Sequence, residues 1–353
     1  MTRKRWALLA LTLLFLSLSA IVALVVWVDP FEIYHQATMF IPPITNGTQN
    51  YANAGIAKSY DYDSVVIGSS MTENFTPSQL DALLGGRFVK LCINGGSCFN
   101  HRQMMDMAFG THDIVRVLYG VDAEALTYFY TTPKTEMPDY LYDDNLFNDV
   151  RYWFNKSVLA SYLPKMLMTL GRTDPDLRDT MYTWGDLYPY GEEAALAGIR
   201  FSAGAVEQEP PSDDPQFSQQ TLLNVEYNIL PYVQAHPDTE FIFFFPPYSL
   251  ARWYEYYSAG MLGYHLTQKE ALISCLLPYE NVRIYDFQAE LGWITDLSNY
   301  IDTGHYGPWI NDAMIDAIAA GQNRVLSLAD AQANDAVLRE RTEELVLAGE
   351  WIY

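Results

Sequence analysis

Five stretches of the chain are continuously apolar and end in small or turn-forming residues. They are "DSVVIGSS" at 63–70, "RFVKLCINGG" at 87–96, "IVRVLYGVD" at 114–122, "TEFIFFFPPYS" at 239–249 and "NVRIYDF" at 281–287. A half-exposed strand alternates apolar and polar residues, whereas a strand covered on both faces is apolar throughout. The pattern therefore predicts buried parallel strands.

Helical patterns fall between these strands, at 76–86, 219–234 and 250–277. The first has Thr76 as a candidate N-cap, Pro77 in its first turn and Gly85 at its exit. Strands that alternate with helices predict an α/β layer sandwich, here with a central parallel sheet of about five strands.

The N-terminus begins with basic residues and continues without a charge from Trp6 to Val28. That run is about 23 residues, or about 34 Å as a helix, which is enough to cross a bilayer. The preceding basic residues predict a cytoplasmic N-terminus, with the rest of the chain outside. A cleaved signal peptide is the alternative, but the run is long for one and lacks an A-x-A site. We expect residues 1–28 to be an uncleaved, single-pass signal anchor in the cell membrane.

Residues 29–60 show no clean period and are interpreted as a stalk before a domain at 61–325. An insert at about 125–218 is aromatic-rich and ends in the polar, proline-rich "AVEQEPPSDDPQ". An insert after a strand's carboxyl end predicts a lid or substrate wall; the alternative is a packing subdomain without a ligand role. Residues 326–353 are predicted to form a peripheral C-terminal helix.

Charge and composition exclude some classes of protein. The net charge is -22, with 43 acidic against 21 basic residues. A nucleic-acid binder needs a basic face to neutralise phosphates, so this class is excluded. The three cysteines are too few for a disulfide framework, and the six histidines lack ligand spacing, so we expect neither a metal site nor a cofactor.

Candidate chemistry gathers where the predicted strands end, because ligands of open α/β sheets bind at the carboxyl ends of strands. The four segments found there are 68–70, 94–97, 120–122 and 300–312. Ser70 on a tight turn would present its hydroxyl at this edge, and backbone N–H groups nearby could stabilise an anion.

The stretch "YIDTGHYGPWIND" at 300–312 places Asp302 three residues before His305. A hydroxyl becomes a nucleophile when a base takes its proton, and that base is usually a histidine oriented by a carboxylate. The pair could serve Ser70 if the loop folds back toward it. The alternative is a polar loop before a helix that begins near Pro308.

Other residues near the strand ends are candidates for substrate contact. His101 follows the second glycine turn, and Tyr248 and Ser249 follow the Pro-Pro corner. A helix start in solvent is the alternative for His101. Tyr306 and Trp309 could border a substrate, although packing is the better interpretation.

The order of these features resembles the SGNH/GDSL hydrolase-like superfamily. "YDYDSVVIGSSMTENFTPSQLD" and "LSNYIDTGHYGPWIND" are similar to a membrane-anchored bacterial branch that includes proteins of teichoic acid D-alanyl transfer and polysaccharide O-acyl transfer. The resemblance covers roughly 60–325 apart from the insert. It implies a flavodoxin-like three-layer SGNH fold, with Ser70 as nucleophile, His305 as base and Asp302 as its orienting carboxylate.

The chain departs from the family pattern at the third of the family's sequence blocks. That block is usually G-x-N, and its Asn donates a hydrogen bond to the oxyanion. Here Gly120 and Val121 are followed by Asp122. The family pattern implies an oxyanion hole from Ser70, Gly95, Gly96 and the Asp122 position. An ionised carboxylate would repel the oxyanion, so Asp122 would have to be protonated, turned away, or bonded to a backbone or substrate group. Losing one donor costs on the order of 10²-fold in rate.

The resemblance implies an extracytoplasmic serine esterase or O-acyltransferase. Its substrates would be acyl esters of cell-envelope polysaccharide or teichoic acid-like polymers, or an acylated carrier, with a multispanning membrane acyltransferase as a partner. The alternative is a non-catalytic envelope glycan-binding or scaffold protein that kept the fold and uses the aromatic insert to stack on sugars.

Overall fold

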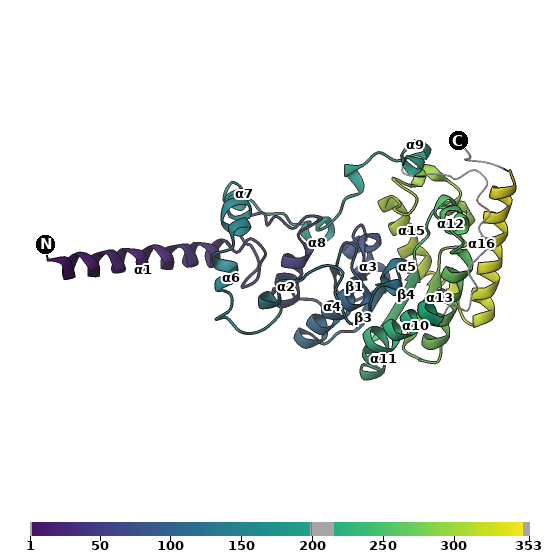
Figure 1. Cartoon of the computed structure of the whole chain (residues 1–353), viewed down its shortest axis with the longest axis horizontal. Helices are drawn as coiled ribbons and strands as arrows, with labels where there is room; N and C mark the ends of the chain where they lie inside the picture. The colour runs from purple at the N-terminus through teal and green to yellow at the C-terminus, as the bar shows by residue number, and fades with distance from the viewer. Residues whose placement is uncertain (1, 198, 200–214, 349–353) are drawn as a thin grey trace. The chain divides into compact units, whose positions relative to one another are not determined.

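The computed structural model describes residues 2–197, 199 and 215–348 (Figure 1). The contacts within the chain divide it into two compact units. The anchor unit contains residues 1–60 and 137–177. The sheet unit contains residues 61–136 and 178–353.

The sheet unit is built on a six-stranded sheet in the order β2-β1-β3-β4-β5-β6. The strands are β1 Ser64–Gly68, β2 Phe88–Cys92, β3 Arg116–Gly120, β4 Glu240–Phe245, β5 Val282–Asp286 and β6 Arg324–Val325. The first five run parallel, and β6 pairs antiparallel with β5. The predicted α/β class and the five parallel strands are confirmed. The two-residue β6 was not predicted, because it is too short to carry a hydrophobic pattern.

The parallel strands are buried on both faces, as their continuous apolar sequences predict. All five residues of β1 and all five of β2 are buried. The order β2-β1-β3-β4-β5 is that of a doubly wound sheet, whose direction of winding reverses between β1 and β3. The residues that follow β1 and β3, among them Ser70 and Asp122, therefore lie at the reversal point.

Helices of the sheet unit pack in two sets. In one, α15 packs against α3; in the other, α10 packs against α13 and α4 against η5. The longer helices are α3 Pro77–Leu84, α4 Cys98–Thr111, α10 Pro215–Asn224, α11 Leu230–Ala235, α12 Leu250–Ser258, α13 Leu262–Leu276, α15 Pro308–Ala319 and α16 Leu328–Ala348. The short ones are η1 Ser70–Thr72, α5 Ala123–Thr127, α8 Leu177–Thr180, η4 Gly185–Leu187, α9 Glu192–Leu196, η5 Val225–Ile229, α14 Leu291–Ile294 and η6 Leu297–Asn299.

Two predicted helices are interrupted, each for a local reason. The helix predicted at 219–234 contains a π-helical turn, η5, that ends two residues before Pro231, which lacks an N–H and crowds the preceding turn. The helix predicted at 250–277 breaks at Gly260, whose φ of +68° leaves the right-handed helical region.

The C-terminal helix α16 is packed into the sheet unit rather than peripheral. Leu338 and Leu345 on α16 join the main hydrophobic core. Asp335 pairs with the buried Lys269 of α13, whose Nζ also lies 2.8 Å from Asp286 Oδ2 at the end of β5. Because an unpaired buried charge is costly, this cluster ties α13, β5 and α16 together.

The anchor unit begins with α1, Arg3–Val28, an apolar helix of 26 residues that is long enough to cross a membrane by length and composition. Its other elements are α2 Gln49–Ser59, η2 Asp139–Leu141, α6 Val150–Trp153, η3 Val158–Tyr162 and α7 Leu163–Leu167. Residues 29–60 were predicted to be a stalk. Instead they fold together with residues 137–177 into one compact unit.

Buried polar contacts hold the segment that follows α1. Asp29, the C-cap of α1, accepts hydrogen bonds at Oδ2 from Tyr34 N–H (2.6 Å) and His35 N–H (3.2 Å). The Tyr152 hydroxyl donates to its Oδ1 at 3.2 Å. The chain that leaves α1 is therefore structured from its first residue.

The predicted insert at 125–218 divides between the two units. Residues 137–177 belong to the anchor unit, and residues 178–197 belong to the sheet unit. The predicted proline-rich loop at 205–216 lies almost entirely outside the described residues.

Candidate active site

A tight turn after β1 positions the Ser70 side chain. A Cβ added at Gly68 would lie 2.5 Å from the Thr72 side chain, so the turn needs glycine there. Ser69 then caps the short helix η1 by accepting a hydrogen bond from Met71 N–H at 3.4 Å. Ser70 follows as its first residue, 9% exposed at the carboxyl edge of the sheet.

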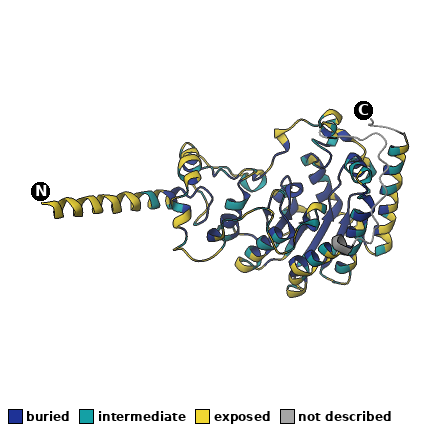
Figure 2. Cartoon of the chain, in the orientation of Figure 1, coloured by how far each residue is buried: buried dark blue, intermediate teal, exposed yellow. Residues whose placement is uncertain are grey.

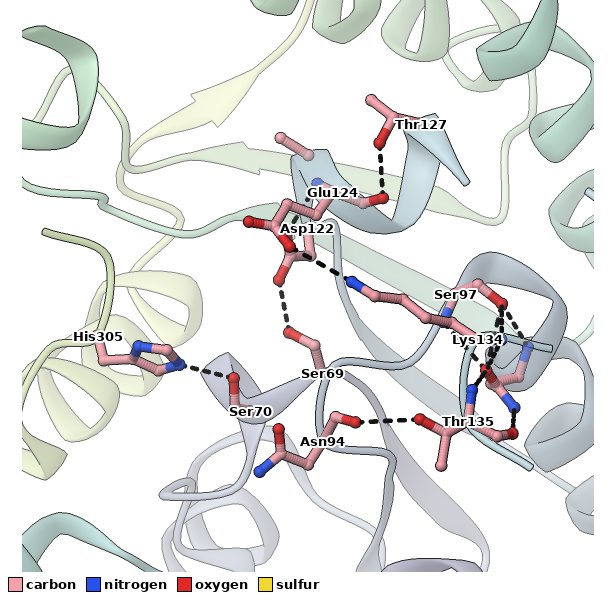
Figure 3. A network of polar contacts seen from close by, with 12 residues as sticks. Ser69, Ser70, Asn94, Ser97, Asp122, Glu124, Thr127, Lys134, Thr135 and His305 are labelled. Carbon is pink, nitrogen blue, oxygen red and sulfur yellow. Dashed lines mark hydrogen bonds and ion pairs between the residues drawn. The ribbon is translucent and has the colours of Figure 1, made fainter. Parts of the chain in front are cut away.

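Ser70, His305 and Asp302 form a continuous chain of hydrogen bonds. The distance from Ser70 Oγ to His305 Nε2 is 2.8 Å, and Figure 3 shows the two side chains pointing toward each other. His305 Nδ1 lies 2.8 Å from Asp302 Oδ2. Both distances lie within the range expected of a nucleophile, its base and the group that orients the base. Ser70 and His305 are 235 positions apart in the sequence, and the fold brings them into contact.

The loop that carries the base is fixed by its own backbone. Asp302 Oδ1 accepts hydrogen bonds from Gly304 N–H at 2.8 Å and His305 N–H at 2.7 Å. The Ser249 hydroxyl donates to the Thr303 carbonyl at 2.7 Å. Ser249 was predicted to contact substrate; it is instead fully buried, caps α12 and supports this loop.

The two charged groups shift each other's pKa in opposite directions. Burial lowers the pKa of His305, but the hydrogen bond and charge of Asp302, together with the charges of Asp122 and Glu73, raise it, so the net shift is upward. Burial raises the pKa of Asp302, but the contacts with His305 and the hydrogen bond from Gly304 N–H outweigh this and lower it to about 2. Asp302 is therefore ionised near neutral pH, as a group that stabilises an imidazolium must be.

Asp122 is the centre of a separate set of contacts beside the nucleophile turn. The Ser69 hydroxyl donates to Oδ2 at 2.7 Å, the Tyr248 hydroxyl donates to Oδ1 at 2.9 Å, and Glu124 N–H donates to Oδ1 at 3.0 Å (Figure 3). A carboxylate that accepts three hydrogen bonds is not an oxyanion donor. Asp122 caps α5 and holds the turn before Ser70, and the buried Tyr248 orients Asp122 rather than a substrate.

The glycine turn after β2 offers one free N–H rather than two. Gly96 was predicted to donate to the oxyanion. Its N–H instead donates to the Ile93 carbonyl at 2.8 Å and is not available to an oxyanion. Gly95 has a φ of +59°, and a Cβ placed there would meet nothing within 4 Å. The N–H groups of Ser70 and Gly95 donate to no other residue in the described ranges. Figure 3 also shows the Asn94 side chain near Ser70, with its amide oxygen on the side of Ser70.

His101 is not part of the site. It is fully buried, and its Nδ1 lies 2.8 Å from the Tyr119 hydroxyl. Burial lowers the pKa of His101 to about 4. The prediction that it lines the substrate pocket is wrong, because its helix, α4, turns this side chain toward the core.

Trp184 contacts two members of the chain of hydrogen bonds and was not singled out from the sequence. Its ring is 5.4 Å from the His305 ring, at an interplanar angle of 86°. Its indole N–H donates to the Ser70 carbonyl oxygen at 3.2 Å, and its backbone N–H donates to Asn74 Oδ1 at 3.0 Å. Trp184 lies within the predicted insert, and the high aromatic content of that insert was the one sequence feature that could have pointed to it.

A buried lysine ties the segment before Trp184 to the turn that follows Ser70. Lys90 Nζ donates to the carbonyl oxygens of Glu73 (2.8 Å), Phe75 (3.0 Å) and Asp179 (3.0 Å). Burial lowers the pKa of Lys90 to about 8. Three carbonyl acceptors satisfy all three ammonium donors, so the lysine acts as a fixed clamp.

Neither a metal nor a known relative explains the site. Among the described residues, no group of three or more His, Cys, Asp and Glu side chains could hold a metal ion. No protein-family model matches the chain, and no curated protein matches its sequence. The chemistry is therefore inferred from the geometry: a serine hydroxyl, a base with its carboxylate, and free N–H groups at one sheet edge.

Proposed function

We propose that the protein is a membrane-anchored serine esterase or O-acyltransferase of the SGNH type. The observation that supports this most is the 2.8 Å contact of Ser70 Oγ with His305 Nε2, together with the 2.8 Å contact of His305 Nδ1 with Asp302 Oδ2. The turn after β1 that carries Ser70 precedes the D-x-x-H loop after β5, which is the order that the SGNH resemblance implies.

In the proposed reaction, Ser70 Oγ attacks the acyl carbonyl while His305 Nε2 accepts the hydroxyl proton. The tetrahedral intermediate collapses as the imidazolium returns that proton to the leaving alkoxide, and an acyl-Ser70 ester remains. Water or a polyol hydroxyl then attacks this ester with His305 again as base, which releases the acid or the new ester. Asp302 holds the imidazole in the tautomer that leaves Nε2 free to accept.

The oxyanion would be held by the N–H groups of Ser70 and Gly95. Ser70 lies in the turn after β1, and Gly95 follows the carboxyl end of β2, the strand paired with β1. Asp122 is excluded from this role because it accepts hydrogen bonds. Its charge instead favours a protonated His305.

The proposed location is the outer side of a cell membrane. Arg3, Lys4 and Arg5 precede α1, and residues 29–57 contain no Lys or Arg. This asymmetry favours a cytoplasmic N-terminus. The proposed substrates, taken from the resemblance, are acyl esters of envelope polysaccharide or teichoic acid-like polymers, and the proposed partner is a multispanning membrane acyltransferase.

A non-catalytic glycan-binding protein is the second candidate, and Asp122 is the observation that favours it. A carboxylate in the third block removes the donor that the family pattern provides. The two candidates differ in whether they turn over an activated ester such as p-nitrophenyl acetate. An intact triad hydrolyses such an ester, and a protein that only binds glycan does not. Turnover that depends on Ser70 supports the enzyme, whereas glycan binding without turnover supports the alternative.

Replacing Asp122 with Asn should move the acid limb of the pH–rate profile to lower pH. The Asp122 charge raises the pKa of His305, and the near-isosteric amide removes that charge while its oxygen can still accept from Tyr248 and Glu124. His305 must be neutral to act as base, so a lower pKa keeps it active at lower pH. The kcat/KM of Asp122→Asn across pH, compared with wild type, checks this. An unchanged acid limb would show that Asp122 does not act on His305.

Replacing Trp184 with Phe should lower kcat by about fivefold with little change in KM. The substitution keeps a ring against His305 but removes the N–H that donates to Ser70 O, and one such hydrogen bond is worth about 1 kcal/mol. The matched control is Trp309→Phe, which removes the indole N–H that donates to Asn299 Oδ1 at 2.8 Å. Steady-state kinetics should show the loss for Trp184→Phe alone. Equal losses in both variants would assign Trp184 a general structural role.

A further inference from the structure

Two short helices of the anchor unit lie against the end of α1. α6 and α7 both contact α1, and Figure 1 shows them on opposite sides of its C-terminal end. Val28 packs there in a small hydrophobic cluster with Phe40, Leu163 and Met166. The position of these helices relative to α1 is therefore fixed by packing inside one unit.

Large apolar side chains around this helix end are exposed. In the anchor unit they are Trp27, Met39, Leu146, Phe147, Val150, Phe154, Met168 and Leu170. Phe147 is 92% exposed and Met168 is 78% exposed. Figure 2 shows exposed positions on both α6 and α7, and Trp27 near the end of α1 is 49% exposed. A cluster of this kind marks an interaction surface rather than the scattered exposure found on most proteins.

The same helices carry a charge opposite to that of the rest of the chain. Residues 150–172 contain Arg151, Lys156, Lys165 and Arg172 and no acidic residue, in a chain of net charge -22. Arg151 pairs with Asp139 at 3.1 Å. Within the described part of the chain, Lys156 and Arg172 form no ion pair. Exposed apolar and basic side chains together are typical of a surface that lies on anionic lipid.

Backbone contacts fix the apolar side chains next to one another. Gly171 N–H donates to the Met39 carbonyl at 2.8 Å, and Ile41 N–H donates to Thr169 Oγ1 at 2.8 Å. These bonds hold residues 39–41 beside residues 168–171. Met39, Met168 and Leu170 are therefore neighbours although two of them lie about 130 residues after the first.

We propose that α6, η3, α7 and residues 39–41 form a membrane collar that lies on the bilayer where α1 leaves it. The apolar side chains enter the boundary between headgroups and acyl chains, and Lys156, Lys165 and Arg172 bind the phosphates of anionic lipids. The occupant is lipid rather than another protein because α6 and α7 contact a helix long and apolar enough to cross a membrane, and their segment carries basic side chains without acidic ones. The collar rests on the proposed uncleaved anchor but is independent of the proposed catalysis.

The test uses the full chain reconstituted into vesicles of phosphatidylcholine and phosphatidylglycerol. A fluorophore is attached at Met168→Cys in a Cys275→Ser background, in which the remaining cysteines, Cys92 and Cys98, are buried. The matched control carries the label at Leu326→Cys, a side chain of the sheet unit that is 70% exposed. Nitroxide-labelled lipid reports contact with the bilayer, and aqueous iodide reports contact with water.

We expect nitroxide lipid to quench the label at 168 at least about twice as strongly as the label at 326, and iodide to show the reverse order. Reversing the charge at Lys156, Lys165 and Arg172 to Glu should weaken lipid quenching at 168, as should omission of phosphatidylglycerol. Equal quenching at both positions in an intact chain would overturn the collar alone. Protection of the label at 168 from both quenchers would overturn it in favour of a protein contact. A smaller chain mass from loss of α1 would overturn both the anchor and the collar, and none of these outcomes depends on esterase activity.

Discussion

Replacing Ser70 with Ala is expected to lower ester turnover by about 10⁶-fold, to the level of catalysis that the remaining groups provide. The reason is that Ser70 Oγ is the atom in contact with the base, 2.8 Å from His305 Nε2. Removing it leaves His305 and Asp302 without a nucleophile. The measurement is kcat/KM for an activated ester, with circular dichroism to show that the variant folds.

Ser69→Ala is the matched control for this prediction. Ser69 is adjacent, is also buried, and donates to Asp122 at 2.7 Å rather than contacting His305. Its loss removes one hydrogen bond that holds the turn, so we expect a decrease of about tenfold or less. If Ser69→Ala abolished turnover and Ser70→Ala did not, Ser69 rather than Ser70 would be the nucleophile.

Replacing Asp302 with Asn is expected to lower kcat by about 10⁴-fold while the fold is retained. The amide can still occupy the site, but its NH₂ group faces His305 Nδ1 and favours the tautomer whose proton sits on Nε2. That tautomer cannot accept the proton of Ser70. The carboxylate also raises the pKa of His305, so its loss should shift the acid limb of the remaining activity to lower pH.

Steady-state rates across pH for Asp302→Asn, with Asp296→Asn as a control, measure both effects. Asp296 is a carboxylate nearby in the chain that caps η6 by accepting hydrogen bonds from the N–H and hydroxyl of Ser298. Asp302→Asn should also move the acid limb further than Asp122→Asn, because the contacts of Asp302 with His305 raise its pKa more than the Asp122 charge does. Wild-type kcat in Asp302→Asn would remove the carboxylate from the mechanism.

The strands and the Ser70–His305–Asp302 contact could be predicted because their signals are local. Continuous apolar runs identify β1 to β5, and parallel strands necessarily bring their carboxyl ends to one edge of the sheet. A serine after β1 and a D-x-x-H loop after β5 can then meet without any knowledge of side-chain packing. The backbone bonds of Asp302 to Gly304 and His305 are likewise local to that loop.

The parts that were missed depend on contacts between distant segments or on the exact turn. Trp184 reaches Ser70 because Lys90 and Asn74 hold its segment from far away in the sequence. The pairing of residues 29–60 with 137–177 carries no periodic signal. Gly96 loses its oxyanion role through one turn hydrogen bond to Ile93, which the glycine pattern alone does not reveal.

The central claim is that Ser70 is an activated nucleophile, and covalent labelling tests it most directly. The full-length protein in detergent is treated with a fluorophosphonate probe, and the adduct is counted by intact mass and located by tandem mass spectrometry. We predict one adduct per chain, on Ser70, which is absent from Ser70→Ala and forms much more slowly in Asp302→Asn. Labelling at full strength in Ser70→Ala, or an adduct on Ser69, would contradict the account.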